Sequence, residues 1–148
     1  MNPAALTTPS IDDDFAVWMA HQITLIRERQ FDQLDFDHLL EELESLVKHR
    51  KTELRSRLRV LTMHLLKWEF QPWLRSPGWV STIITQRIEI EELLEENPSF
   101  RRLLKGYAEQ AYPRAVRGAV KETSLPLATF PSDLPYSEEQ LLDDDFFP

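Results

Sequence analysis

The sequence predicts an all-α fold: a helical bundle of about four main helices around one long helix, with a short C-terminal helix packed on the bundle. Three observations support this class. Apolar residues recur at intervals of three and four over most of the 148 residues, which is the helical period. Only three glycines are present, and this disfavours a fold full of tight hairpin turns. Serine or asparagine stands directly before proline at 76–77 and 97–98, a pattern typical of helix starts.

The first helix is predicted to follow a short lead. Residues 1–9 contain two prolines and are expected to be frayed. Ser10 and Asp13 have the spacing of a capping pair, and the acidic side chains at 12–14 suit the positive end of a helix. Apolar residues at helical spacing then extend this helix to about Arg29.

The longest predicted element runs from about Phe36 to Phe70, with Asp32 or Asp35 as its cap. It contains neither glycine nor proline. At 1.5 Å per residue its length is about 50 Å, more than the width of a compact domain of this size. We therefore expect this helix to bend or to project into a dimer. Its apolar stripe consists of Leu39, Leu43, Val47, Leu54, Leu58, Leu61, Leu65 and Trp68.

Two further helices and a C-terminal segment complete the predicted single domain, residues 1–148. Ser76–Pro77 and Asn97–Pro98 each start a helix, and the second of these carries alanines at helical spacing that permit close helix approach. The leucines and aromatics of residues 124–148 predict an ordered tail packed on the bundle. Ser137 and Gln140 have the spacing of a capping box for the short last helix.

Composition excludes several classes of protein and sets the expected setting. The net charge of −8 opposes binding to phosphate backbones, so we expect no nucleic-acid partner. The absence of cysteine rules out disulfides, thiolate zinc sites and thiol catalysis. No apolar run approaches the ~20 residues of a membrane span, and the first eight residues do not resemble a secretory leader. We expect a cytoplasmic protein without a cofactor.

Metal binding receives little support from the sequence. His38 with Glu42, and His49 with Glu53, are spaced four apart and could each offer two ligands on one helix face. The Glu-x-x-His pairs of di-iron bundles and the His-Glu-x-x-His motif are both absent. We therefore predict no metal site, and interpret these pairs as exposed helix charges.

Polar residues border the apolar stripe of the long helix. Arg50, Arg57 and His64 follow one another at seven-residue intervals, so they share nearly one angle of the helix. On the next helix, Arg87 falls between apolar residues and is predicted to point inward. An inward arginine needs a partner, because an unpaired buried charge costs several kcal/mol. In residues 54–59, the two arginines other than Arg57, namely Arg55 and Arg59, are expected to be solvated.

Two interpretations of this polar seam remain open. One is a structural network of ion pairs, in which Glu41, Glu42 or Glu53 pairs with Arg87 and fixes the helix register. The other is a site for a small anionic ligand. Its residues would be Arg50, Arg57, Lys67 and Arg87 as ligand-binding groups, and His64 and Glu42 as candidates for catalysis.

Residues 58–104, LRVLTMHLLKWEFQPWLRSPGWVSTIITQRIEIEELLEENPSFRRLL, resemble a known family, as do the opening DFAVWMAHQITLIRERQFDQLDFDHLLEELESL and the ending LPLATFPSDLPYSEEQLLDDDFFP. That family is the bacterial domain of unknown function 29, found in cyanobacteria and proteobacteria. The resemblance covers about Asp14 to Pro148 and departs at Val47–Lys48, where relatives often carry Leu-Gly. It implies an all-helical bacterial cytosolic protein and no known activity. The matching positions are Trp18, Glu41, Glu42, Leu58, His64, Lys67, Trp68, Gln71, Pro72, Trp79, Gln86, Arg87 and Pro98.

The helical build, the acidic surface and the lack of a catalytic motif together favour a protein–protein interaction or regulatory module. Its partner would be another bacterial protein or a second copy of the chain. The alternative is an enzyme or binding protein for a small anionic ligand, with His64 as acid or base and Arg57 and Arg87 holding the anion.

Overall fold

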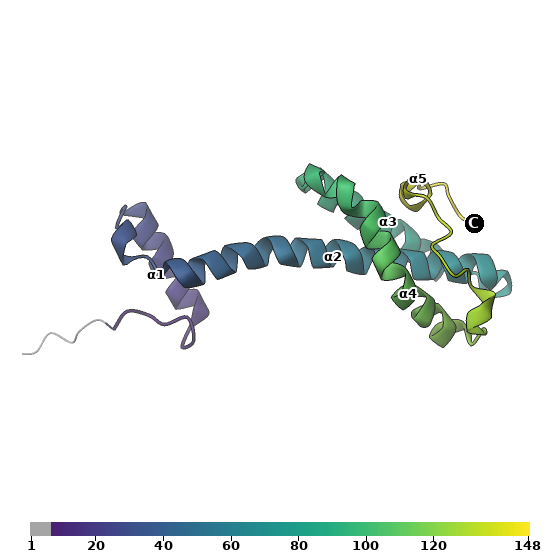
Figure 1. Ribbon diagram of the computed structural model, residues 1–148, viewed down its shortest axis with the longest axis horizontal. Helices are drawn as coiled ribbons and strands as arrows, with labels where there is room; N and C mark the ends of the chain where they lie inside the picture. Colours follow the sequence, from purple (N-terminus) through teal and green to yellow (C-terminus); the bar gives the residue numbers. More distant parts are fainter. Residues whose placement is uncertain (1–6) are drawn as a thin grey trace, which may run out of the picture. The chain divides into compact units, whose positions relative to one another are not determined.

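The computed structural model describes residues 7–148, which consist of helices and connecting turns without a strand (Figure 1). The predicted all-α class is confirmed. Of the predicted frayed lead, residues 1–9, the first six lie outside the described residues. The α-helices of the described range are α1 (Phe15–Arg27), α2 (Phe36–Phe70), α3 (Pro77–Glu96), α4 (Leu104–Thr123) and α5 (Glu138–Leu142).

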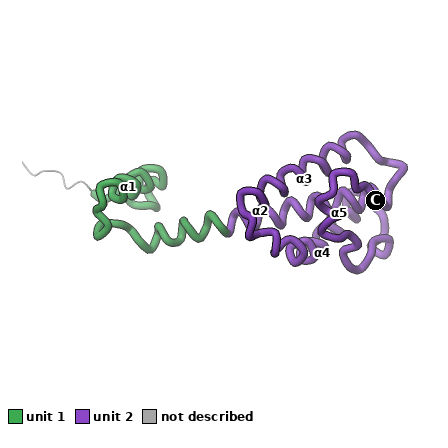
Figure 2. The backbone as a smooth tube through the Cα atoms, turned by 90° about the horizontal axis from the view of Figure 1, so that it is seen from above, with its two compact units in different colours: residues 1–47 green, residues 48–148 purple. Residues whose placement is uncertain are grey.

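The chain divides into two compact units, residues 1–47 and residues 48–148 (Figure 2). We call them the N-terminal unit and the C-terminal unit. The first part of α2 belongs to the N-terminal unit and its remainder to the C-terminal unit. The single domain expected from the sequence stays a prediction.

The start of α1 differs from the prediction. The helix begins at Phe15, and its cap is Asp14, whose Oδ1 accepts a hydrogen bond of 3.0 Å from the backbone N–H of Val17. The predicted capping pair instead forms a turn before the helix, in which the N–H of Asp13 donates to the carbonyl oxygen of Ser10. Asp14 supplies the side-chain oxygen that a helix start requires, so the earlier pair is not needed as a cap.

Asp35 joins α1 to the start of α2. Its carboxylate accepts from Trp18 Nε1 at 3.1 Å and from His38 Nδ1 at 2.8 Å. Its backbone N–H donates to Oε1 of Gln22 at 2.9 Å. Trp18 and Gln22 are buried, so these bonds satisfy polar atoms that have lost water. Asp35 Oδ1 also accepts from the backbone N–H of His38 at 3.5 Å, so of the two predicted caps for the long helix, Asp35 is the one that the structure uses.

The bounds of α2 agree with the predicted range from Phe36 to Phe70. Its stripe is buried only in the C-terminal unit, where Leu54, Leu58, Leu61 and Leu65 have no exposed surface. In the N-terminal unit Leu39 of the same stripe is half-buried, and the residues after it are open to solvent. The side chains of Leu43 and Val47, for example, are more than half exposed.

The core of the C-terminal unit lies between α2, α3 and α4. Helix α3 begins after Ser76, whose Oγ accepts from the N–H of Trp79, as the Ser-Pro pattern predicts. A short 3-10 segment, Pro98–Leu103, precedes α4, so α4 begins later than Pro98, where it was predicted. At Gly118 of α4 a Cβ atom would lie only 2.5 Å from the sulfur of Met63, which shows how closely α4 approaches α2. The predicted small-residue stripe of α4 is buried at Leu104, Ala108, Ala111, Ala115 and Ala119.

The segment after α4 lies on the C-terminal unit. Phe130, Tyr136 and Leu141 are buried and belong to the same core cluster as the helices. The predicted capping box is present: Ser137 Oγ accepts from the N–H of Gln140, whose Oε1 accepts in turn from the N–H of Ser137. This box starts α5 and sets the direction of the last residues.

Candidate functional site

The first group of seam residues is an ion-pair cluster between α2 and α3. Arg57 donates from Nε and Nη2 to Oε1 of Glu53, at 3.1 and 2.9 Å, and its Nη2 lies 3.1 Å from Glu89 Oε2. Arg50 is half exposed and lies 3.8 Å from Glu53 and 3.6 Å from Glu96. Three glutamates therefore surround two arginines, and the cationic charge expected to attract an anion is compensated here.

The second group contains His64 and Lys67. His64 is half-buried and donates from Nδ1 to the carbonyl oxygen of Val60 at 2.9 Å. Burial lowers the pKa of His64, and the nearby Lys67 ammonium lowers it further. Lys67 is buried, and its Nζ lies 2.6 Å from Oε2 of Glu122 and 4.5 Å from the ring centroid of Trp79. His64 is thus held mainly neutral near pH 7, beside a paired lysine.

Arg87 forms the third group, and it holds the C-terminal segment. Its guanidinium is fully buried and donates to the carbonyl oxygens of Leu141, Gln140 and Phe146, at 2.9, 3.1 and 2.8 Å. It also lies 5.6 Å from the ring centroid of Phe147. Burial lowers the pKa of Arg87, and the acidic residues 143 and 144 oppose that shift.

The predicted inward orientation of Arg87 is confirmed, but the predicted pairing with a glutamate of the long helix is wrong. Backbone carbonyls of the tail take the place of that glutamate. Glu42, the remaining candidate, is half-buried and belongs to the N-terminal unit. The other candidates make their contacts within the first two groups, Arg50 and Arg57 in one and His64 and Lys67 in the other, so these contacts do not describe one common pocket.

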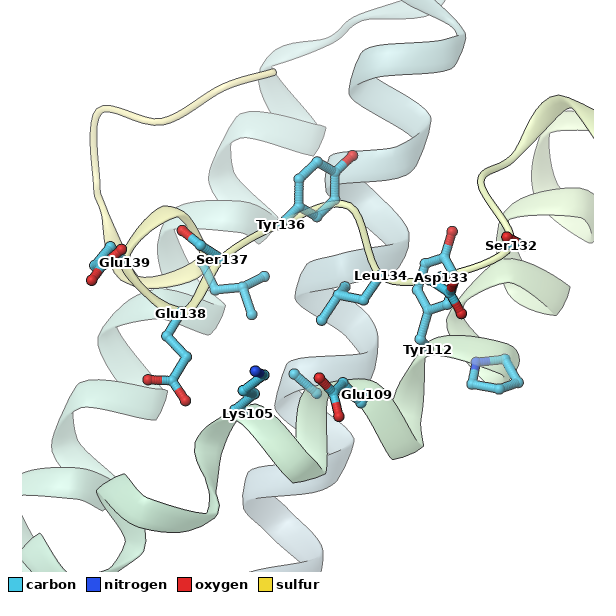
Figure 3. Close-up of a pocket in the computed structure, with 13 residues that line it drawn as sticks. Lys105, Glu109, Tyr112, Ser132, Asp133, Leu134, Tyr136, Ser137, Glu138 and Glu139 are labelled. Carbon is cyan, nitrogen blue, oxygen red and sulfur yellow. The ribbon is translucent and has the colours of Figure 1, made fainter.

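A cavity of about 720 Å³ lies between α4 and residues 132–141 (Figure 3). Lys105 and Glu109 line it from α4, and Glu138 and Glu139 line it from the start of α5. Asp133 adds a further carboxylate, so acidic groups dominate the lining. Across the described range, no three His, Asp or Glu side chains are grouped so that they could hold a metal ion. His64 and Arg87 do not line this cavity.

Tyrosine hydroxyls fix the walls of this cavity. Tyr112 donates to the carbonyl oxygen of Pro131 at 2.6 Å, and Tyr136 donates to Oε2 of Glu69 at 2.7 Å. Burial and the Glu69 carboxylate raise the pKa of Tyr136 far above its ordinary value. Both hydroxyls are engaged in positioning the tail, which leaves them without a role as acids or bases near neutral pH.

The N-terminal unit exposes an unusual amount of apolar surface. Along its part of α2, five large apolar side chains are each more than half exposed. Four of them are spaced by three, four and seven and share one face, and the fifth, Leu46, lies at the edge of that face. We call this set the α2 apolar face. Four large apolar side chains of α1 are also exposed, by between 42% and 51%: Phe15, Val17, Ile23 and Ile26. The α2 apolar face consists of Phe36, Leu40, Leu43, Leu46 and Val47.

Two sets of residues in the structure were not singled out from the sequence. Leu43 and Val47 of the α2 apolar face belong to the predicted leucine stripe, whereas Phe36, Leu40 and Leu46 do not. The second set lines a cavity between α2 and α4 and includes Arg55 and Arg59, which were expected to be solvated. Arg55 is exposed as expected, whereas Arg59 is half-buried.

These features define an all-α protein with an apolar face on one unit and compensated polar clusters on the other. No α-helix of the described range is long and apolar enough to cross a membrane. The chain belongs to the family described as Domain of unknown function DUF29, whose model matches residues 11–147. Comparison with curated proteins and with solved structures finds no match.

Proposed function

We propose that this protein is an interaction module that associates with a second copy of itself through the α2 apolar face. The observation that supports this most strongly is the exposure of that face. Leu43 is 61% exposed and Leu46 is 63% exposed, in a helix whose other half buries its leucines completely. Contiguous apolar surface of this kind is typical of protein-binding sites.

The size of the face agrees with a small dimer interface. Each of its five side chains exposes roughly 100 Å², so two copies would bury about 1,000 Å² in total, which is near the lower limit for a specific interface. The apolar residues of α1 would add to this area if they joined the contact. A weak, concentration-dependent dimer is the expected result.

The charge pattern of α2 favours a second copy in antiparallel orientation. Residues 37–44 contain four acidic residues and neither lysine nor arginine, whereas residues 48–51 contain Lys48, Arg50 and Lys51 and no acid. Antiparallel pairing sets the acidic segment of one chain beside the basic segment of the other. Parallel pairing would set acid beside acid, which costs affinity and selects against that orientation.

The alternative function, binding of a small anion in the polar seam, has weaker support. Arg57 already contacts two glutamates, Lys67 contacts Glu122, and Arg87 donates to three backbone carbonyls. An anion would have to displace these partners. No contact of His64 in the described range places it beside a free cationic group that could hold a substrate.

Sedimentation velocity over a concentration series from about 1 to 100 µM tests the proposal. The wild-type chain should shift from monomer to dimer across this range, as expected for an interface of about 1,000 Å². Leu43→Glu should weaken association at least about a hundredfold, because a carboxylate would be desolvated in each half of the symmetric contact.

The matched control is Leu74→Glu, which makes the same change at a leucine of the C-terminal unit that is 55% exposed. It should associate like the wild type. A wild-type chain that stays monomeric at every concentration contradicts the proposal, as does a Leu43→Glu variant that dimerises normally. Circular dichroism of each variant checks that the helices are retained.

A further inference from the structure

A second concave site lies in the C-terminal unit, between α2 and α4. It has a volume of about 380 Å³, and neither the α2 apolar face nor the polar seam contributes to it. Ala111 is the only apolar residue in its lining. The polar residues that line it are Thr52, Arg55, Ser56, Arg59, Gln110 and Arg114.

The lining is cationic in a chain whose net charge is −8. It contains three arginines and no carboxylate. Elsewhere in the same unit Arg50, Arg57 and Arg101 each lie within ion-pair distance of a glutamate. Among residues 7–148, no such pair involves the arginines of this cavity. Their positive charge is therefore available to a ligand.

The contacts of Arg55 orient its guanidinium without supplying a negative charge. Its guanidinium carbon lies 5.0 Å from the ring centroid of Tyr107, and its Nη2 lies 3.4 Å from the hydroxyl of Thr52. A cation–π contact orients a guanidinium but supplies no counter-charge. Tyr107 and Thr52 are both uncharged, so the Arg55 guanidinium is oriented but keeps its charge on the α2 wall of the cavity. Arg114 lies on the α4 wall.

The local sequence explains why these groups meet. Residues 52, 56 and 59 are spaced by four and three on α2, and residues 110 and 114 are spaced by four on α4, so each set lies on one helix face. The small residues of α4 bring the two helices close, as the contact between Gly118 and Met63 shows. Polar faces on both helices then form the two walls of one cavity.

We propose that this cavity binds a small phosphate-bearing anion, of the size of pyrophosphate or of the diphosphate part of a nucleotide. Guanidinium groups match the oxygens of phosphate, and the hydroxyl and amide groups of the lining can donate further hydrogen bonds. The volume is near the lower end of the range for small-molecule sites. An extended nucleic acid is disfavoured, because the net charge of −8 of the chain repels a long polyanion.

Isothermal titration calorimetry at low ionic strength, with inorganic pyrophosphate and with adenosine diphosphate as separate probes, tests this proposal. The wild-type chain should bind pyrophosphate, and the double variant Arg59→Gln/Arg114→Gln should bind it at least tenfold more weakly. Equal affinity for the two probes identifies the phosphates as the recognised group. Tighter binding of adenosine diphosphate assigns the cavity to a nucleotide.

Arg102→Gln is the matched control, since it removes the same charge from an exposed arginine outside the cavity. It should bind pyrophosphate within about twofold of the wild type. Thermal unfolding supplies a second readout: pyrophosphate should raise the Tm of the wild type and of Arg102→Gln, but not that of the double variant. The proposal is wrong if millimolar pyrophosphate and adenosine diphosphate give no binding, or if the double variant binds like the control. Preferential binding of an oligonucleotide that Arg102→Gln also weakens would contradict it too.

Discussion

Replacing Arg87 by methionine should loosen the C-terminal segment and lower the stability of the C-terminal unit. The guanidinium donates three hydrogen bonds to carbonyl oxygens of residues 140, 141 and 146. Methionine keeps most of the apolar contact area and removes every donor, so three carbonyls lose their partner. At about 1 kcal/mol for each unsatisfied carbonyl, the free energy of unfolding should fall by about 3 kcal/mol.

Thermal unfolding followed by circular dichroism at 222 nm measures this loss. A change of about 3 kcal/mol corresponds to a fall in Tm of about 6–12 °C for a chain of this size. Amide hydrogen exchange gives the local readout, and residues 138–147 should exchange faster in Arg87→Met than in the wild type. The control is Arg101→Met, which removes an exposed arginine paired with Glu91 at 3.4 Å and should cost less than about 1 kcal/mol. An Arg87→Met variant with wild-type Tm and unchanged exchange in the tail would refute this reasoning.

Three further predictions concern titration and pairing. Histidine NMR titration should place the pKa of His38 above 6.5, because its carboxylate partner raises it, and that of His64 below 6.5, because burial lowers it. The stabilisation from His38 is then present below pH 6.5 and is lost as the pH rises through the pKa of His38 in the folded chain. The stabilisation from His64 is present above pH 6.5 and is lost as the pH falls through the pKa of His64 in the folded chain. Titration of both histidines together at 6.5 would contradict this. A double-mutant cycle of Lys67→Met and Glu122→Gln, measured by urea unfolding, should give a coupling free energy of about 1–3 kcal/mol, and strict additivity would show that the pair contributes nothing. Tyr136→Phe should lower stability by about 1–2 kcal/mol, and ultraviolet titration should show one fewer tyrosine that resists ionisation until the chain unfolds.

Local signals predicted much of the fold. The range of α2 followed from an uninterrupted helical period without glycine or proline, and Ser76 and Ser137 cap helices where their spacing to later residues indicates. The start of α1 was less certain, since Ser10 and Asp14 both carry capping oxygens and local sequence cannot rank them. The wrong pairing of Arg87 has a different cause. Backbone carbonyls can also accept from a guanidinium, and because every residue carries one, the sequence does not indicate which of them will do so.

The candidate sites were harder to predict, because they depend on which helix faces remain uncovered. A leucine at position 43 has the same period as one at position 58, yet only the second is buried. The cationic cavity joins residues near 55 to residues near 112, and their register is set by packing of α2 on α4. Helical spacing alone groups residues within one helix and does not place two helices against each other.

Distances between spin labels test the proposed self-association most directly. The chain contains no cysteine, so Asp37→Cys and Glu44→Cys each provide a single labelling site beside the α2 apolar face. In an antiparallel dimer centred on Ser45, which sets residues 41 and 42 of one chain beside residues 49 and 48 of the other, the two labels at position 37 should lie about 26 Å apart and those at position 44 about 10 Å apart. Electron paramagnetic resonance at high protein concentration measures both. Equal distances for the two positions would contradict the antiparallel arrangement, and the absence of dipolar coupling in both would contradict self-association through this face.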